Sequence, residues 1–372
     1  MRGLLALSLL VGCFSPKIQA GAPCPDDICP DGLVCSPATK TCERTATEAD
    51  AGVDAPFDAP TRAIRYRRRI SITNGAATAL PAGFTIRATI PAVLGSMLAQ
   101  SRVKADLSDL HVEGDGAIGE RDRIIDPANG PAPGSLSFAL QTQIAAGATS
   151  TEYSLTYGGD NAAAALARGA QVFPLYDDFA TGISTVWQRN DGPAAVNGKL
   201  VLRAGHSDAL TSTAATDGVP TISALELVAS VTDATSAGTA QGAETFFYWF
   251  GYQRTGDFTA NAPWALWVAR SKAQIRAEQQ SPVGCENQNQ CVGTAATQNT
   301  GAHYYAIERD TAATRFYLDG QLSYTATVTN NADYAIIVRN FMATSDVQID
   351  WIRARARVSP DPVVTVGPEE TY

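Results

Sequence analysis

The sequence predicts an all-β protein made of two β-sandwiches. Short runs such as "RRISI", "FTIRATI" and "TEYSLTY" alternate apolar with polar residues, as strands with one buried face do. Asn-Gly and Asp-Gly pairs punctuate such runs, as in "AAVNGKLVLRA" and "TRFYLDGQLSYTATV", and both dipeptides favour tight hairpin turns. Only residues 161–170 have the composition of a helix, and they lie between two strand-rich blocks.

The N-terminus combines one basic residue with a short apolar run and a cysteine. The run is shorter than the roughly 20 residues of a membrane-spanning helix but suits a secretory signal. The segment Leu10-Val11-Gly12-Cys13 resembles the lipobox of bacterial lipoproteins. That resemblance implies removal of residues 1–12, a lipid on Cys13 and, because Phe14 replaces the usual inner-membrane retention residue, transfer to the outer membrane. Ordinary cleavage near Ala20 or Ala22 is the alternative.

Six further cysteines predict disulfides, because an exported chain enters an oxidising compartment. The first four lie within residues 13–42, a segment too short to build a hydrophobic core, so two crosslinks would order it. Zinc binding is the alternative for this cluster. The last two are expected to pair around a small polar loop. The first four are Cys24, Cys29, Cys35 and Cys42, with their pairing left open, and the last pair is Cys285–Cys291.

Residues 43–62 predict a disordered tether, since small, acidic and proline residues there cannot bury enough apolar surface to fold. From residue 63 onward the sequence changes to short runs that alternate apolar with polar residues. These strand-rich blocks predict a first sandwich at 63–165 and a second at 172–368.

Both blocks resemble known bacterial domains. On "YRRRISITN", "KADLSDLHV" and "TEYSLTYGGDNA", the first resembles a domain of unknown function that precedes laminin G-like modules. It departs from that pattern at Ile64 and Arg69, where tryptophan and proline are usual. On "FPLYDDFATG", "VNGKLVL" and "VQIDWIRARARVSPDPVVTVGPEE", the second resembles a concanavalin A-like or laminin G-like jelly roll. The resemblance implies the fold and not the ligand, because this fold hosts lectins, hydrolases, lyases and spacers.

The net charge and the histidine content argue against two classes of function. A net charge of −9 and a pI of about 4.9 argue against nucleic acid, which needs a basic surface. The three histidines are far apart in sequence, which argues against a histidine-rich metal site.

Motifs for catalysis are missing. Enzymes of this fold that cut glycans usually carry two carboxylates on one strand face, spaced as E-x-D-x-x-E. Glu226 and Glu278 each stand in a strand without such a partner, and no nucleophile or zinc motif is found. The sequence therefore predicts a protein that is not an enzyme, with a glycan-active hydrolase or lyase as the minority alternative.

Aromatic residues suggest a sugar-binding surface. Strand alternation in "ETFFYWFGYQ" and "APWALWVARS" is interpreted as turning Leu266 and Val268 inward, and Trp249 and Trp267 outward. In "QIRAEQQ" the polar residues would face outward too. Burial of the tryptophans in the core is the alternative. The predicted ligand-binding residues are Trp249, Trp267, Arg276, Glu278 and Gln280.

The predicted function is non-catalytic binding of extracellular carbohydrate or a surface partner by an exported lipoprotein, anchored in the outer membrane at the cell surface or the periplasmic face. A structural spacer or adhesin subunit making protein–protein contacts is the first alternative. No cofactor is expected beyond a candidate structural calcium ion, with Asp177, Asp178 and Asp350 as its ligands. The four arginines within residues 65–69 are expected to form a solvated strand face that guards an edge.

Overall fold

The computed structural model describes most of the chain from residue 65 onward and a few positions before it. The described residues are 24, 29, 34–35, 40–43, 65–126, 132–158, 164–205, 207–211, 223–232, 248–254, 264–271, 274–280, 290–297, 299–310, 312–327, 334–341 and 345–371. The chain divides into two compact units, Met1–Arg62 and Ala63–Tyr372. The predicted signal, Cys13 and most of the predicted tether lie outside the described residues.

The first unit is held by two disulfides. They join Cys24 to Cys35 and Cys29 to Cys42, which settles the pairing that the sequence left open. A two-stranded ladder accompanies them, in which β1 (Val34–Cys35) pairs with β2 (Cys42–Glu43). Because two residues per strand bury almost nothing, the crosslinks supply the order.

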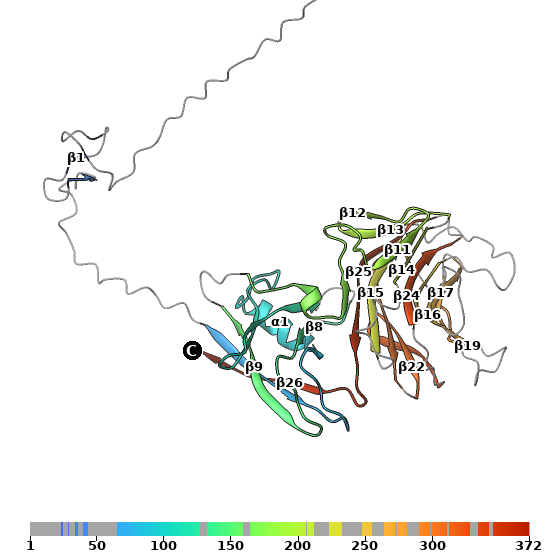
Figure 1. Ribbon diagram of the computed structural model, residues 1–372, viewed down its shortest axis with the longest axis horizontal. Helices are drawn as coiled ribbons and strands as arrows, with labels where there is room; N and C mark the ends of the chain where they lie inside the picture. Colours follow the sequence, from blue (N-terminus) through green and yellow to red (C-terminus); the bar gives the residue numbers. More distant parts are fainter. Residues whose placement is uncertain are drawn as a thin grey trace, which may run out of the picture. The chain divides into compact units, whose positions relative to one another are not determined.

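The first sandwich of the second unit packs a five-stranded sheet on a three-stranded one (Figure 1). Ile70 and Leu155 from the larger sheet share a core with Phe138 from the smaller. The larger sheet has the order β26-β3-β9-β5-β6, with β26 at Val363–Thr371, β3 at Tyr66–Thr73, β9 at Thr149–Tyr157, β5 at His111–Gly114 and β6 at Gly119–Arg121. The smaller has the order β4-β8-β7, with β4 at Thr85–Thr89, β8 at Ser135–Ala139 and β7 at Arg123–Asp126.

The α-helix of the described residues is not where the sequence suggested. Helix α1 spans Pro91–Ala99, begins on a proline whose missing N–H costs nothing there, and buries Leu94 and Met97. Residues 164–168 are not helical and lead into the 3₁₀ turn η2 (Gly169–Gln171). Here Ala165 donates its N–H to the Ser108 carbonyl at 2.7 Å, so hydrogen bonds to the first sandwich replace those of a helix. No helix among the described residues is long and apolar enough to cross a membrane.

The second sandwich is a concanavalin A-like jelly roll of two large antiparallel sheets. We name them the junction sheet, which packs against the first sandwich, and the far sheet. The junction sheet has the order β12-β13-β25-β15-β21-β22-β23, with β10 also on β25: β10 is Leu175–Asp177, β12 Ala194–Val196, β13 Lys199–Leu202, β15 Ser223–Val231, β21 His303–Arg309, β22 Thr314–Leu318, β23 Gln321–Ala326 and β25 Val347–Ala356. The far sheet has the order β11-β14-β24-β16-β17-β18-β19, with β20 also on β18: β11 is Trp187–Asn190, β14 Ser207–Thr211, β16 Tyr248–Arg254, β17 Trp264–Ser271, β18 Gln274–Gln280, β19 Gln290–Val292, β20 Ala296–Thr297 and β24 Tyr334–Asn340.

The two hairpins predicted most clearly are confirmed. Asn197-Gly198 joins β12 to β13, and Asp319-Gly320 joins β22 to β23. All four turn residues have positive φ, between 49° and 77°, the backbone that these dipeptides tolerate best.

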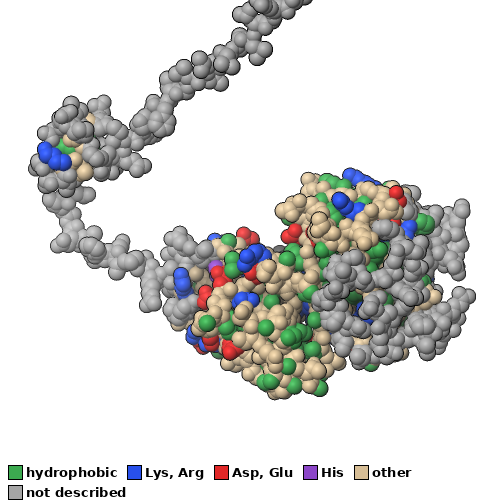
Figure 2. All heavy atoms as spheres, viewed as in Figure 1, with side chains coloured by type: hydrophobic (Ala, Val, Ile, Leu, Met, Phe, Trp, Pro, Cys, Tyr) green, Lys and Arg blue, Asp and Glu red, His purple; other side chains and the backbone are tan. Residues whose placement is uncertain are grey.

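The strand β26 returns the chain to the first sandwich. It pairs with β3, although the predicted second domain, 172–368, contains most of it, so this boundary is corrected to the start of β26. The register places Glu369 opposite Arg68 and Glu370 opposite Arg67, and the Arg67–Glu370 ion pair closes at 2.8 Å. Strand β3 is therefore an internal strand, and its arginines face residues of the neighbouring strands; they do not guard a sheet edge as predicted. Figure 2 shows acidic and basic side chains interspersed over the first sandwich.

The sandwiches are joined by a buried ion network. Arg353 on β25 donates to Asp126 on β7 at 3.0 and 2.6 Å, and to Glu226 on β15 at 2.8 and 2.6 Å. Arg87 on β4 reaches the other Glu226 oxygen at 2.9 Å. Arginines of both sandwiches thus meet the same carboxylate, which fixes β4 and β7 against the junction sheet.

Candidate functional site

The far sheet has one face that does not contribute to the inter-sheet core. Its other face packs with Leu225, Leu227 and Ile349 of the junction sheet, whereas a separate apolar cluster contains far-sheet residues alone. We name the side bearing this second cluster the far face. The cluster is Leu210, Trp249, Trp264, Leu266, Val268, Ala335 and Ile337.

Four of the five predicted ligand-binding residues share the far face. Trp249 belongs to its cluster, and Val268 is registered opposite both Trp249 and Arg276. Glu278 is registered opposite Leu266, and Gln280 opposite Trp264. The alternation interpreted for β16 and β18 therefore matches the strand faces in the structure, but Trp249 is only 3% exposed and Glu278 is fully buried, so neither projects into solvent as predicted.

Trp267 was assigned to the wrong face. It is fully buried in the inter-sheet core, with its ring 5.5 Å from that of Tyr305 and 5.8 Å from that of Phe316. Its indole N–H donates to the Ala306 carbonyl at 3.3 Å. Leu266 and Val268, interpreted as pointing inward, lie on the far face instead. The error arose because β17 is apolar on both faces, so alternation carried no signal.

Glu278 is a buried carboxylate on the far face. None of its side chain is exposed, and Arg276, two residues earlier on the same face, donates to it at 2.7 Å. The Arg276 side chain is 30% exposed. Solvent therefore reaches this ion pair from the arginine side, over β18.

A second charged group lies across the sheet. Arg339 on β24 contacts Asp208 on β14 at 3.0 Å, and both side chains are buried. The guanidinium also lies near two rings, 4.9 Å from the centre of Trp249 and 4.7 Å from that of Phe341. Phe341 is partly exposed. Flat aromatic and charged groups of this kind suit sugar rings and their hydroxyls.

The two carboxylates that the described residues place on the far face are too far apart to act on one bond. Asp208 on β14 is separated from Glu278 on β18 by β24, β16 and β17. Four inter-strand steps of about 4.8 Å give roughly 19 Å. Glycosidases need carboxyl groups about 5.5 Å apart for retention and about 6.5–9.5 Å apart for inversion.

The aspartates proposed for calcium have other partners. Asp177 accepts hydrogen bonds from the backbone N–H groups of Phe179 and Ser184, and from the Trp187 indole at 2.9 Å. Asp178 caps the N–H of Ala180. Asp350 pairs with Lys199 at 2.7 Å. Among the described residues, the one cluster with metal-ligand spacing is formed by Cys24, Cys29 and Cys42, all in disulfides.

Cys291 lies beside the far face, on β19, opposite Gln279 of β18. It is disulfide-bonded. Cys285, its predicted partner, lies outside the described residues.

Among the described residues, some of the largest pKa shifts belong to the ion network between the two sandwiches, which we call the junction. Burial alone would raise the pKa of Glu226, but Arg87, Arg353 and Arg355 outweigh it and hold that pKa well below its usual range. Burial likewise raises the pKa of Tyr304. Sequence reasoning missed this network. The signal was the alternation of Arg353 and Arg355 on one face of β25, continued by Arg357 just after the strand, while the other face of the strand is core.

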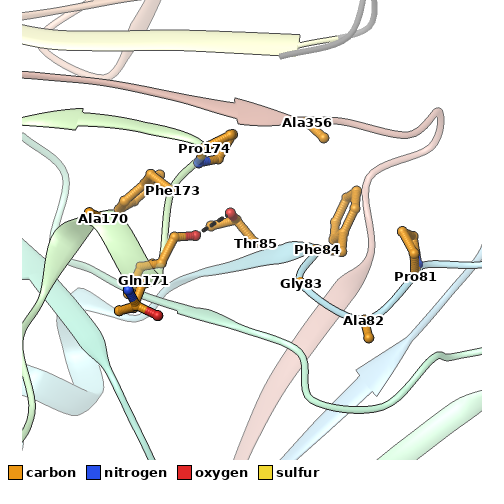
Figure 3. Close-up of a pocket in the computed structure, with 11 residues that line it drawn as sticks. Pro81, Ala82, Gly83, Phe84, Thr85, Ala170, Gln171, Phe173, Pro174 and Ala356 are labelled. Carbon is orange, nitrogen blue, oxygen red and sulfur yellow. Dashed lines mark hydrogen bonds between the residues drawn. The ribbon is translucent and has the colours of Figure 1, made fainter. Parts of the chain in front are cut away.

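Two cavities lie near this junction. The larger, about 330 Å³, is lined mostly by apolar residues, including Phe84, Phe173 and Pro174 (Figure 3). The Thr85 hydroxyl there already donates to the Val172 carbonyl at 2.5 Å. The smaller, about 150 Å³, is lined by charged and hydroxyl side chains.

Comparison with known proteins gives matches among solved structures alone. No protein family and no curated protein matches the chain. A structure from a study of endo-acting O-glycanases of human gut microbiota is 18% identical, with a TM-score of 0.37, and covers 49% of this chain and 98% of its own. An endo-β-1,3-glucanase from Pyrococcus furiosus is 12% identical, with a TM-score of 0.38, over 50% and 94%. The laminarinase catalytic domain from Thermotoga maritima is 12% identical, with a TM-score of 0.37, over 50% and 98%.

These matches contradict two predictions. The sequence predicted binding without catalysis and a protein that is not an enzyme, whereas the similar structures are glycan-cleaving enzymes. At these identities and TM-scores the matches assign no residue roles, and the jelly-roll fold rests on the two sheets described above.

Proposed function

We propose that the protein is a glycan-active hydrolase that takes an extracellular polysaccharide across the far face. The observation that carries the proposal is the Glu278–Arg276 pair, a carboxylate with none of its side chain exposed on a face that the inter-sheet core does not use. Burying a charge is costly. Such charges concentrate where chemistry needs them.

In this proposal Glu278 is one of the two catalytic carboxylates, and Arg276 positions it. Phe341, which is 36% exposed, offers a ring on which a neighbouring sugar unit stacks, and the buried Trp249 and Arg339 pack against that ring. Candidates for the second carboxylate are taken from the sequence between far-sheet strands. By sequence, Asp257 lies between β16 and β17, and Glu286 between β18 and β19, both outside the described residues.

The test is hydrolysis by the full chain, measured as new reducing ends. The substrates are β-1,3-glucan, mixed-linkage glucan and mucin O-glycans, chosen after the similar structures. Glu278→Gln should lower kcat by at least about 100-fold, the usual contribution of a positioned acid or base. Substituting the second carboxylate, through Asp257→Asn or Glu286→Gln, should cause a comparable loss.

A matched control separates chemistry from folding. Asp208→Asn also removes a buried carboxylate paired with an arginine on the far face, but roughly 19 Å away from Glu278. It should keep far more activity than Glu278→Gln at a similar melting temperature. Wild-type protein that releases no reducing ends from any substrate, or Glu278→Gln with full activity, would contradict the proposal.

We also propose that the chain is exported and anchored by a lipid on Cys13, as the lipobox-like segment suggests. The two disulfides of the first unit support an oxidising destination. We also propose that residues 63–165 form the domain of unknown function that the sequence resembles. Of the two faces of the outer membrane, the cell surface would give the far face access to extracellular polysaccharide.

A further inference from the structure

The small polar cavity at the junction is built from three strands and a connecting loop. Its volume is about 150 Å³. Strand β4 contributes Thr85, Arg87 and Thr89, β21 contributes Glu308, β25 contributes Arg355, and the loop before β26 contributes Asp361 and Pro362. None of these residues belongs to the far sheet, so this is a different place from the proposed hydrolytic site.

Arg355 is the unusual group in this cavity. Its side chain is only 6% exposed, yet its guanidinium lies 3.5 Å from Glu226, 3.9 Å from Glu308 and 4.0 Å from Asp361. These are ion-pair distances beyond good hydrogen-bond geometry. The buried Nε, which is nearest Glu226, has no hydrogen-bond partner among the described residues, and Nη2 is the nitrogen nearest the two carboxylates that line the cavity. Its neighbour Arg353, in contrast, makes four hydrogen bonds of 2.6–3.0 Å. Leaving a buried charged donor unused is costly.

The distances of 3.9 Å and 4.0 Å from Arg355 to Glu308 and Asp361 suit a ligand group that bridges the guanidinium to these two carboxylates. Such a group must accept from the guanidinium and donate to Glu308 or Asp361. A hydroxyl does both, and a sugar presents several in fixed positions. Thr89 adds a further hydroxyl from β4.

The charges of the lining decide the ligand class. Two arginines and two carboxylates line the cavity, so they cancel. An anion would meet Glu308 and Asp361, and a cation would meet Arg87 and Arg355. The volume lies below the roughly 300–1,000 Å³ of pockets for drug-sized ligands, which limits the occupant to about one ring. We propose that this cavity binds a single neutral sugar unit, held by Arg355, Glu308 and Asp361.

The test is ligand-observed NMR of the full chain with neutral monosaccharides, glucuronate and inorganic phosphate as separate probes. A neutral sugar should bind, whereas glucuronate and phosphate should not compete with it. Asp361→Asn should raise the dissociation constant at least about 10-fold. The Asp361 side chain is 35% exposed but pairs with Arg357 at 2.8 Å, so the melting temperature of this variant is measured beside its affinity. Thr89→Val, on an exposed position, should weaken binding by a smaller factor.

Two controls keep this proposal separate from the hydrolase. Asp346→Asn removes a carboxylate near the other end of β25, paired with Arg203 at 3.1 Å, and should leave sugar binding unchanged. Glu278→Gln should also leave it unchanged while abolishing hydrolysis. Three results would each overturn the inference: no neutral sugar binds, phosphate or glucuronate binds in its place, or Asp361→Asn binds as well as wild type.

Discussion

Replacing Arg353 with methionine should strongly destabilise the second unit. The arginine side chain is 1% exposed, and its four hydrogen bonds hold Asp126 and Glu226, whose side chains are 6% and 1% exposed. After the change Glu226 would keep Arg87 at 2.9 Å, but Asp126 would keep only the Ser135 hydroxyl at 2.6 Å. A buried carboxylate would then lack its counter-ion. Removing one partner of a buried pair costs about 3–5 kcal/mol of unfolding free energy.

The assay is equilibrium urea unfolding of the full chain, followed by far-UV circular dichroism and tryptophan fluorescence. Arg203→Met is the matched control, because Arg203 also pairs with a carboxylate, Asp346, but is 55% exposed. An exposed pair contributes less than about 1 kcal/mol. If Arg353→Met loses no more stability than Arg203→Met, the network does not hold the sandwiches together and the reasoning fails.

Three other perturbations test separate parts of the structure. Trp267→Ala should cost about 3–5 kcal/mol in urea unfolding, because the ring fills the inter-sheet core; a melting temperature within a degree of wild type would contradict that placement. Since the folded pKa of Glu226 is depressed, its stabilisation is complete above about pH 4.3, its unfolded pKa, and is lost as the pH falls further. Glu226→Gln should therefore unfold more easily at pH 7 and show a shallower loss of melting temperature below about pH 4.3; an unchanged acid profile would argue against the ion network. Cys13→Ala should abolish lipid labelling and release the protein from the membrane fraction, whereas equal membrane association of both forms would refute the anchor.

Local sequence was sufficient for the all-β class, the two sandwiches and the hairpins. Asn197-Gly198 and Asp319-Gly320 adopt positive φ because their own side chains permit it, so the turns do not depend on distant contacts. Alternation also assigned the faces of β16 and β18 correctly; in β18 the apolar Ile275 and Ala277 mark the core face, and Arg276 and Glu278 mark the other. The candidate pair Arg276 and Glu278 could therefore be placed on one surface from the sequence.

Tertiary structure alone decided which residues lie on each face of a strand that is buried on both sides. It also decided which residues distant in sequence contact each other. Strand β17 is buried on both faces, so Trp267 and Leu266 could exchange sides without breaking any local rule. Strand β26 joins β3 because Glu369 and Glu370 find Arg68 and Arg67 there, a match between residues about 300 positions apart. The junction likewise depends on distance in space: Arg353 can be buried only because Asp126 and Glu226 arrive from two different sheets to neutralise it.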